Sequence, residues 1–316
     1  MATALATLRD LPQAPPACLG PYRVIGSIAV GGMGIVLRGQ DLRDGGLVAL
    51  KTVRWPGSAD AASLRREIAA LGRMSHPGIV RLIADGTWNG MPWMAMELLG
   101  GQPVSERIES LFGPQPGTRR SDDLPTMPAR SRADGRWGTG PVRITPQPVA
   151  GAGRLRDAIG IVVQLCQALD YVHALGLVHR DVKPANVLVG DDGRVTLLDF
   201  GLVCSTRGAG RCAAAAEICV GTMEYAAPEQ IRGEAVDARA DIYSLGCVLY
   251  ELVTGRRPID GDSSREPAAP SELVSGVPHE LEALLLAMLA QRPDDRPASA
   301  GAVAETLTHL AERSAR

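Results

Sequence analysis

The sequence predicts an α+β protein of two lobes, in which a small strand-rich lobe precedes a larger helical one. Three observations support this prediction. Residues 22–97 are short apolar runs separated by glycine-rich turns, a pattern typical of strands. After residue 153, apolar residues recur every three or four positions, as on the buried face of a helix. Between these parts, residues 113–153 contain seven prolines and seven glycines and are expected to be a disordered insertion.

The strand-rich lobe contains one predicted helix. It lies between about residues 61 and 74, because Leu64, Ile68 and Leu71 recur at intervals of four and three and form one apolar face. Residues 1–21 contain four prolines and no sustained period, so we expect a flexible tail. The predicted strands span residues 22–29, 35–38, 48–53, 79–84 and 91–97.

The helical lobe begins with its longest predicted helix, which runs to about residue 175 along an apolar stripe that starts at Leu155. Two strand-like runs bracket a turn at residues 190–193. The insertion is either a tolerated surface loop or a docking or regulatory element, and the sequence leaves this open. The two strands are predicted at residues 187–189 and 195–198, and further helices at 241–253, 280–289 and 300–310.

Composition excludes several classes of protein. Of the 316 residues, 45% are apolar and 22% are charged, which is typical of soluble globular proteins. The net charge of −2 gives no electrostatic reason to expect nucleic acid or a membrane as partner. We expect a cytoplasmic chain, because neither a spanning helix nor a secretory leader is visible. The six cysteines form no Cys-x-x-Cys pair and are expected to be thiols.

Lysine is restricted to two positions, Lys51 and Lys183, whereas arginine occurs 31 times. A compact ammonium suits a tight phosphate site better than a planar guanidinium does. Lys51 follows a glycine-rich turn whose backbone amides could approach a polyphosphate, although such hairpins also occur in ordinary sheets. Glu67, on the predicted helix, could pair with Lys51, or it could be a solvated glutamate. The turn contains Ala29, Gly31, Gly32 and Gly34.

Two motifs in the helical lobe are more specific. HRDVKPAN occupies residues 179–186, and DFG follows at residues 199–201. With these motifs the sequence resembles the eukaryotic-like, or Hanks-type, serine/threonine protein kinases of bacteria. The resemblance implies a bilobal protein-kinase-like fold over residues 22–312. Its small antiparallel-sheet N-lobe would span residues 22–97, the hinge 97–101 and the helical C-lobe 154–312.

The resemblance implies a role for each matching residue. Asp181 would accept or orient the substrate hydroxyl, and Lys183 would neutralise charge on the transferred phosphoryl group. Asn186 and Asp199 would bind Mg²⁺, or Mn²⁺ as an alternative, beside ATP. Thr222, together with Lys183, marks serine/threonine rather than tyrosine specificity in this family.

The resemblance also implies an adenine pocket and a peptide-binding segment. Pocket residues of this kind are ordinary core until a nucleotide binds. Residues 221–229, GTMEYAAPE, match a segment that small-molecule phosphotransferases lack. The resemblance also implies that Glu229 pairs with Arg296, and that Asp241 anchors the catalytic loop, which is the HRDVKPAN segment of residues 179–186. The matching pocket residues are Val36, Ala49, Met96, Glu97, Leu99 and Leu188.

The sequence departs from the family in the glycine-rich turn and in the segment after DFG. Ala29 replaces the first glycine of the turn, a change that we expect nucleotide binding to survive. No serine or threonine lies between Thr206 and Thr222, so we expect activation without phosphorylation there and a standing charge from Glu217. Three cysteines in or just before that segment suggest either apolar filler or redox control. They are Cys204, Cys212 and Cys219.

The sequence as a whole predicts an ATP- and Mg²⁺-dependent serine/threonine protein kinase. Its partners would be protein substrates and a second copy of the chain for autophosphorylation. The alternative is a pseudokinase, a nucleotide-binding scaffold without turnover. The complete set of catalytic residues favours the enzyme, because a scaffold needs no catalytic base.

Overall fold

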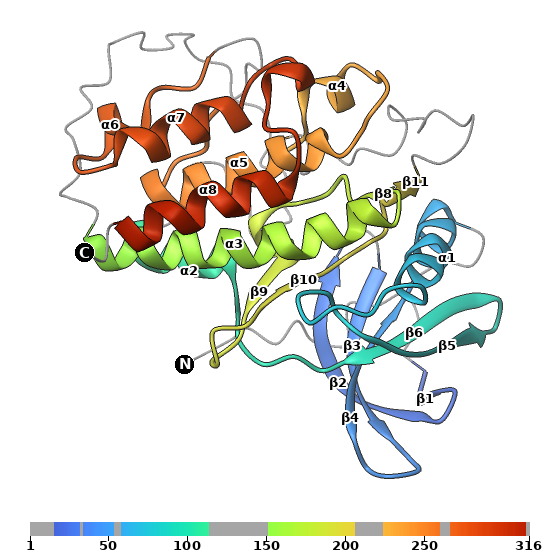
Figure 1. The fold of residues 1–316 in the computed structure, drawn as a ribbon. Helices are drawn as coiled ribbons and strands as arrows, with labels where there is room; N and C mark the ends of the chain where they lie inside the picture. The colour runs from blue at the N-terminus through green and yellow to red at the C-terminus, as the bar shows by residue number, and fades with distance from the viewer. Residues whose placement is uncertain are drawn as a thin grey trace, which may run out of the picture.

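The structure is a computed structural model that describes residues 16–31, 34–53, 58–113, 151–205, 224–259 and 266–313. It has the two predicted lobes, a sheet with one helix packed against a larger group of helices (Figure 1). Strands β9 (Val187–Val189) and β10 (Val195–Leu197) lie between the two parts in this view. The predicted fold class is therefore confirmed.

The N-lobe is a six-stranded antiparallel sheet of order β1-β2-β3-β4-β6-β5. Val36 lies opposite Lys51, and Ala49 lies opposite Met96. Opposed residues, and residues two apart on one strand, share a face of the sheet, so these four side chains share one face. The strands are β1 (Cys18–Leu19), β2 (Tyr22–Gly31), β3 (Gly34–Asp41), β4 (Leu47–Thr52), β5 (Leu82–Trp88) and β6 (Met91–Glu97).

Helix α1 (Ala59–Leu71) packs against this sheet. Ser58 caps it, because its side chain accepts a hydrogen bond of 3.2 Å from the Ala61 N–H. Leu64 and Leu71 are buried on the predicted apolar face. Glu67 is buried with them, so it is not the solvated glutamate that the sequence left as an alternative.

The C-lobe is built around two long helices, α3 and α5. Residues 240–254 of α5 are all buried, and α8 packs along α3 (Figure 1). Strands β7 (Gln102–Pro103), β9 (Val187–Val189) and β10 (Val195–Leu197) form a small sheet, and β8 (Leu177–Val178) pairs with β11 (Cys204–Ser205). The helices are α2 (Val104–Phe112), α3 (Ala152–Ala174), α4 (Pro228–Ile231), α5 (Arg239–Thr254), α6 (Pro270–Leu273), α7 (His279–Met288) and α8 (Ala300–Arg313).

Several predicted boundaries shift by a few residues, and two of these shifts have a physical cause in the fold. The predicted tail of residues 1–21 includes β1, whose Leu19 is fully buried beside Trp93 in a second apolar cluster of the N-lobe. Strand β5 begins at Leu82 rather than at residue 79, because Ile79 instead forms a parallel bridge to Leu197 of the C-lobe.

The predicted insertion also ends earlier than residue 153. Helix α3 begins at Ala152, and residues 114–150 of the insertion lie outside the described residues. Among the described cysteines, Cys18, Cys166 and Cys247 are thiols as predicted, whereas Cys204 is disulfide-bonded, contrary to the prediction. In the part of the chain that the structure describes, no helix is long and apolar enough to cross a membrane.

Candidate active site

Lys51, Glu67 and Asp199 meet where α1 faces the sheet and the start of the DFG segment. The Lys51 Nζ lies 2.7 Å from Glu67 Oε2 and 3.0 Å from Asp199 Oδ1. Only 12% of the Lys51 side chain is exposed, and only 2% of Glu67. The predicted pairing of Lys51 with Glu67 is therefore confirmed. Because Lys51 also reaches Asp199, 148 residues further along the chain, it joins the two lobes.

Burial and charge act in opposite directions on these three groups. Burial raises the pKa of Glu67 to about 7, because desolvation of its carboxylate outweighs the ammonium of Lys51. Burial alone would lower the pKa of Lys51, but the carboxylates of Glu67 and Asp199 raise it overall. Burial alone would raise the pKa of Asp199, but the Lys51 ammonium lowers it overall. Lys51 is therefore charged and Asp199 ionised at neutral pH.

Because the pKa of Glu67 is raised, the stability of the wild type should depend on pH in a way that the stability of the variant Glu67→Gln does not. The carboxyl ionises near 4.5 in the unfolded chain and near 7 in the folded protein, so the folded state holds an extra proton between these values. The free energy of unfolding of the wild type should therefore fall, relative to that of Glu67→Gln, as the pH rises through this window. Urea unfolding of both proteins at about pH 5 and about pH 8 measures the difference. Parallel profiles, or a relative gain by the wild type, would contradict it.

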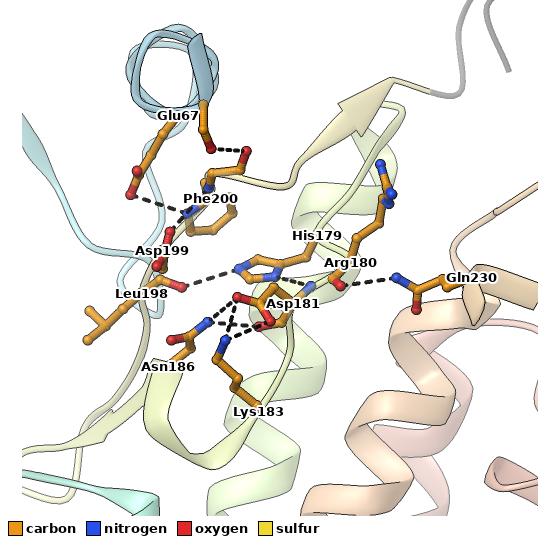
Figure 2. Close-up of polar contacts among 12 residues, drawn as sticks. Glu67, His179, Arg180, Asp181, Lys183, Asn186, Leu198, Asp199, Phe200 and Gln230 are labelled. Atoms are coloured by element: carbon orange, nitrogen blue, oxygen red, sulfur yellow. Dashed lines mark hydrogen bonds and ion pairs between the residues drawn. The ribbon is translucent and has the colours of Figure 1, made fainter. Parts of the chain in front are cut away.

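The catalytic loop brings Asp181, Lys183 and Asn186 together (Figure 2). Lys183 Nζ donates to both Asp181 carboxylate oxygens, at 2.9 and 2.8 Å. Asn186 Nδ2 donates to the Asp181 backbone carbonyl and to its Oδ2, each at 2.9 Å. Burial raises the pKa of Asp181 in spite of the neighbouring Lys183. Asp181 is thus a buried carboxylate held in one orientation by its own loop.

The carboxylate of Asp241 on α5 fixes the backbone of this loop, as the sequence predicts. Its carboxylate accepts the backbone N–H groups of His179 and Arg180, each at 2.8 Å. His173 of α3 lies 2.8 Å from the same carboxylate, a partner that sequence reasoning missed. Burial alone would raise the pKa of Asp241, but the hydrogen bonds from His173 and His179 lower it overall. This anchor supports Arg180, whose backbone φ of 68° is unusual for a residue with a side chain.

His179 connects the catalytic loop to the DFG segment. Its Nδ1 accepts the Asp181 N–H at 3.2 Å, and its Nε2 lies 3.3 Å from the Leu198 carbonyl oxygen (Figure 2). Its ring packs edge-on against Phe200, with centroids 4.6 Å apart. Burial lowers the pKa of His179, which keeps the ring neutral and leaves one nitrogen able to accept.

Asp199 and Asn186 have the free oxygens that a hard cation requires. Lys51 and the Gly201 N–H both bind Asp199 Oδ1, and within the described residues Oδ2 has no hydrogen bond. The Asn186 amide uses its nitrogen on Asp181, and within the same residues its Oδ1 is also unbound. Carboxylate and amide oxygens suit Mg²⁺. No group of three or more His, Cys, Asp or Glu that could hold a metal occurs among the residues described, so phosphate or water oxygens would have to complete the site.

Three residues of the predicted adenine pocket, Val36, Ala49 and Met96, lie on the sheet face that carries Lys51. Ala49, Met96 and Val36 belong to one apolar cluster, and the part of that cluster that the structure describes does not include Leu188. Leu188 is half-buried on β9, opposite Pro103. Leu99 is half-buried after β6.

The glycine-rich turn is described only at its two ends. Gly31 ends β2 and pairs with Gly34, which begins β3, and the exposed Ala29 pairs with Val36. A side chain at Gly34 would collide with the Thr52 backbone carbonyl, so glycine is required there. Gly32 lies outside the described residues.

Glu97, at the start of the hinge, is held by neighbours that the sequence did not suggest. Its carboxylate accepts the Arg81 N–H at 2.9 Å, and its own N–H donates to the Arg81 carbonyl at 3.1 Å. Arg194, from the turn between β9 and β10, approaches Glu97 to 3.8 Å and donates to the Pro77 carbonyl at 2.6 Å. The C-lobe therefore contacts both the hinge and the loop after α1.

The catalytic loop also contacts the described segment that begins at residue 224. Gln230 Nε2 donates to the Arg180 carbonyl at 3.1 Å (Figure 2). The predicted pair of Glu229 and Arg296 is confirmed, with contacts of 2.6 and 2.8 Å and both side chains buried. Thr222 lies outside the described residues. The same is true of the other residues predicted to act in that segment, which are Cys212, Glu217 and Cys219.

Comparison with known families agrees with this geometry. The family model of the protein kinase domain matches residues 148–309, just over half of the chain. A model of the phosphotransferase enzyme family matches residues 50–206, which include Lys51 and the catalytic loop but end before residue 224.

Several named proteins are similar to this chain. The serine/threonine-protein kinase PknB of Mycolicibacterium smegmatis is 33% identical over 304 residues, which are 91% of this chain and 42% of the relative. A probable serine/threonine-protein kinase of Streptomyces coelicolor is 33% identical over 89% of this chain and 38% of its own length. The chain thus spans only about two fifths of these relatives. The PknI kinase domain of Mycobacterium tuberculosis superimposes with a TM-score of 0.64 at 27% identity, covering 92% of this chain and 97% of that domain.

Proposed function

Because this chain belongs to the protein kinase domain family, we propose that it transfers the γ-phosphoryl group of ATP to serine and threonine hydroxyls of proteins. The family uses ATP together with a divalent metal ion. The observation that carries the proposal is the convergence of Lys51, Asp199, Asn186 and Asp181 from both lobes.

The N-lobe residues would bind the nucleotide. The apolar face formed by Val36, Ala49 and Met96 supports an adenine site beside the hinge. Lys51 would bind phosphate oxygens, and its pairing with Glu67 holds its ammonium at the end of that face. Backbone N–H groups of the turn that contains Gly34 would approach the phosphates closely.

Asp199 Oδ2 and Asn186 Oδ1 would hold the metal ion, which we propose to be Mg²⁺. When bound, the ion would neutralise charge on the phosphate oxygens. Mn²⁺ shares this preference for oxygen ligands and is expected to substitute. Lys51 keeps Asp199 ionised, and so ready to act as a ligand, because its ammonium lowers the pKa of that carboxyl.

Asp181 would receive or orient the proton of the substrate hydroxyl. Its raised pKa makes its carboxylate a better proton acceptor than an exposed aspartate. Asn186 fixes its orientation through Oδ2, and Lys183 would stabilise negative charge on the group in transfer. The enzyme contributes positioning and electrostatic stabilisation, which is what phosphoryl transfer requires.

A protein substrate is favoured over a small molecule. The protein kinase match continues to residue 309, through the segment that holds Glu229 and Arg296 and supports Arg180 through Gln230. The match to the phosphotransferase family ends before that segment. We propose that Thr222, in the same segment, contributes the preference for serine and threonine.

The experiment is phosphoryl transfer from γ-labelled ATP to a generic basic protein, followed by phosphoamino acid analysis. Label on serine and threonine is expected, with transfer lowered about 10²- to 10⁴-fold in Asp181→Asn. The exposed Asp157 of α3 provides a matched control, so Asp157→Asn should keep full activity. ATP binding without transfer by the wild type would select the pseudokinase instead.

The same proposal includes autophosphorylation between two copies of the chain, in the cytoplasm where ATP is available. An intermolecular reaction is second order in protein, so its specific rate should rise in proportion to protein concentration. A specific rate that stays constant on dilution would contradict a reaction between separate copies of the chain.

A further inference from the structure

Ser63 of α1 contacts the DFG segment at a point that the proposed mechanism does not use. Its hydroxyl donates a hydrogen bond of 2.8 Å to the Gly201 backbone carbonyl. Glu67 lies one turn further along the same helix, and its Oε1 accepts the Phe200 N–H at 3.3 Å (Figure 2). One helix face therefore holds two successive residues that directly follow Asp199.

Asp199 needs such support because its backbone is strained. Its φ of 60° lies in the left-handed region, which is unfavourable for a residue with a side chain. On its N-terminal side, the Leu198 N–H donates to the Asn186 carbonyl at 2.8 Å. On its C-terminal side, the contacts from α1 to Phe200 and Gly201 hold the backbone. The direction of the Asp199 carboxylate depends on both sides being fixed.

We propose that Ser63 is a positioning residue that couples α1 to the metal-binding carboxylate of Asp199. This inference rests on the proposed function, because it takes Asp199 to be a metal ligand. Gly201 lies close to both groups, since a Cβ at that position would be 2.8 Å from Ser63 Oγ and 3.2 Å from Asp199 Oδ1, so a side chain there would displace them. When the Ser63 hydroxyl is lost, Gly201 loses its link to α1 and Asp199 leaves its metal-binding orientation more often.

Ser63→Ala tests this inference through metal dependence. One hydrogen bond between neutral groups shifts an equilibrium by about fivefold. We expect the affinity for the non-hydrolysable analogue AMPPNP in the presence of Mg²⁺ to fall about fivefold, whereas the affinity for AMPPNP without metal stays unchanged. Calorimetric titration of AMPPNP with and without Mg²⁺ measures both. In the transfer assay, kcat should fall while the KM for protein substrate is unchanged.

Two further variants separate positioning from general destabilisation. Ser63→Thr keeps the hydroxyl and should keep the Mg²⁺-dependent affinity. Ser110→Ala removes a similar bond, of 2.7 Å to the Arg107 carbonyl, at an exposed place on α2, and should change neither affinity. Alanine is a stronger helix former than serine, so Ser63→Ala is expected to fold.

Because AMPPNP binding is measured separately from phosphate transfer, a failure of this inference can be distinguished from a failure of the proposed function. If the wild type binds AMPPNP in a Mg²⁺-dependent way but transfers no phosphate, the proposed kinase activity fails and the Ser63 comparison still decides the inference. Equal Mg²⁺-dependent affinities of Ser63→Ala and wild type would overturn the inference, and so would an equal loss with and without metal. A wild type whose nucleotide affinity does not respond to Mg²⁺ would overturn the inference and the proposed metal site, whereas the transfer assay decides the kinase activity independently.

Discussion

Lys51→Met is expected to lower kcat for phosphoryl transfer by about 10²- to 10³-fold. This is the typical cost of removing one preorganised hydrogen-bond donor that stabilises charge in the transition state. Methionine is unbranched, so the apolar part of the side chain keeps its packing on β4. The variant loses the ammonium that lies 2.7 Å from Glu67 and 3.0 Å from Asp199. It should remain folded, because Glu67, whose pKa burial raises to about 7 even beside Lys51, can take up a proton once the ammonium is gone. Steady-state kinetics at saturating ATP measure the effect.

The decreases in kcat caused by Lys51→Met and by Glu67→Gln should not multiply when the two substitutions are combined. Glu67→Gln keeps an oxygen that can accept the Phe200 N–H and removes only the charge that holds Lys51, so Lys51→Met combined with Glu67→Gln should be hardly slower than Lys51→Met alone. Arg65, exposed on the same helix, is the control, and Arg65→Met should keep normal kcat. Full activity in Lys51→Met, or strictly multiplicative losses in the double variant, would contradict the role given to this pair.

Arg296→Ala is expected to destabilise the C-lobe by about 3 to 5 kcal/mol, because it leaves a buried carboxylate without its partner. Arg296 is fully buried, and its guanidinium donates to both Glu229 carboxylate oxygens, at 2.6 and 2.8 Å. It also donates to three backbone carbonyls, those of Arg239, Ala290 and Gln291, at 3.0, 2.8 and 3.2 Å. All five donors of the side chain are thus in use.

The matched control for Arg296 is an exposed pair of similar length. Arg313 lies 2.7 Å from Glu280, but 70% and 52% of the two side chains are exposed. Arg313→Ala should change the free energy of unfolding by less than about 1 kcal/mol. Urea unfolding of both variants measures the contrast. Equal effects of the two substitutions would show that the buried pair of Arg296 and Glu229 is not a major support of the lobe.

The part of the site that could be predicted consists of residues in short motifs. Asp181, Lys183 and Asn186 are close in the sequence, so one loop brings their side chains together. The strands and long helices could also be predicted, because their apolar periods of two and three to four are local properties. Lys51 and Glu67 could be paired in advance because a lysine on a strand and a glutamate on the next helix have few other arrangements in this fold.

The rest could not be predicted because it depends on contacts between distant segments. Nothing in the local sequence of Ser63, His173 or Arg194 distinguishes it from an ordinary surface residue, and each finds its partner more than 60 residues away. In the sequence, strand β1 cannot be distinguished from a tail, because its two residues have no period of their own. Its Leu19 is buried only once the sheet has formed.

A crystal structure with Mg²⁺ and AMPPNP would test most directly whether one triphosphate site joins the two lobes. We predict phosphate oxygens on Lys51, the metal ion on Asp199 and Asn186, and the γ-phosphorus facing Asp181. A nucleotide bound elsewhere, or a metal ion that contacts neither Asp199 nor Asn186, would contradict the proposed function at its centre.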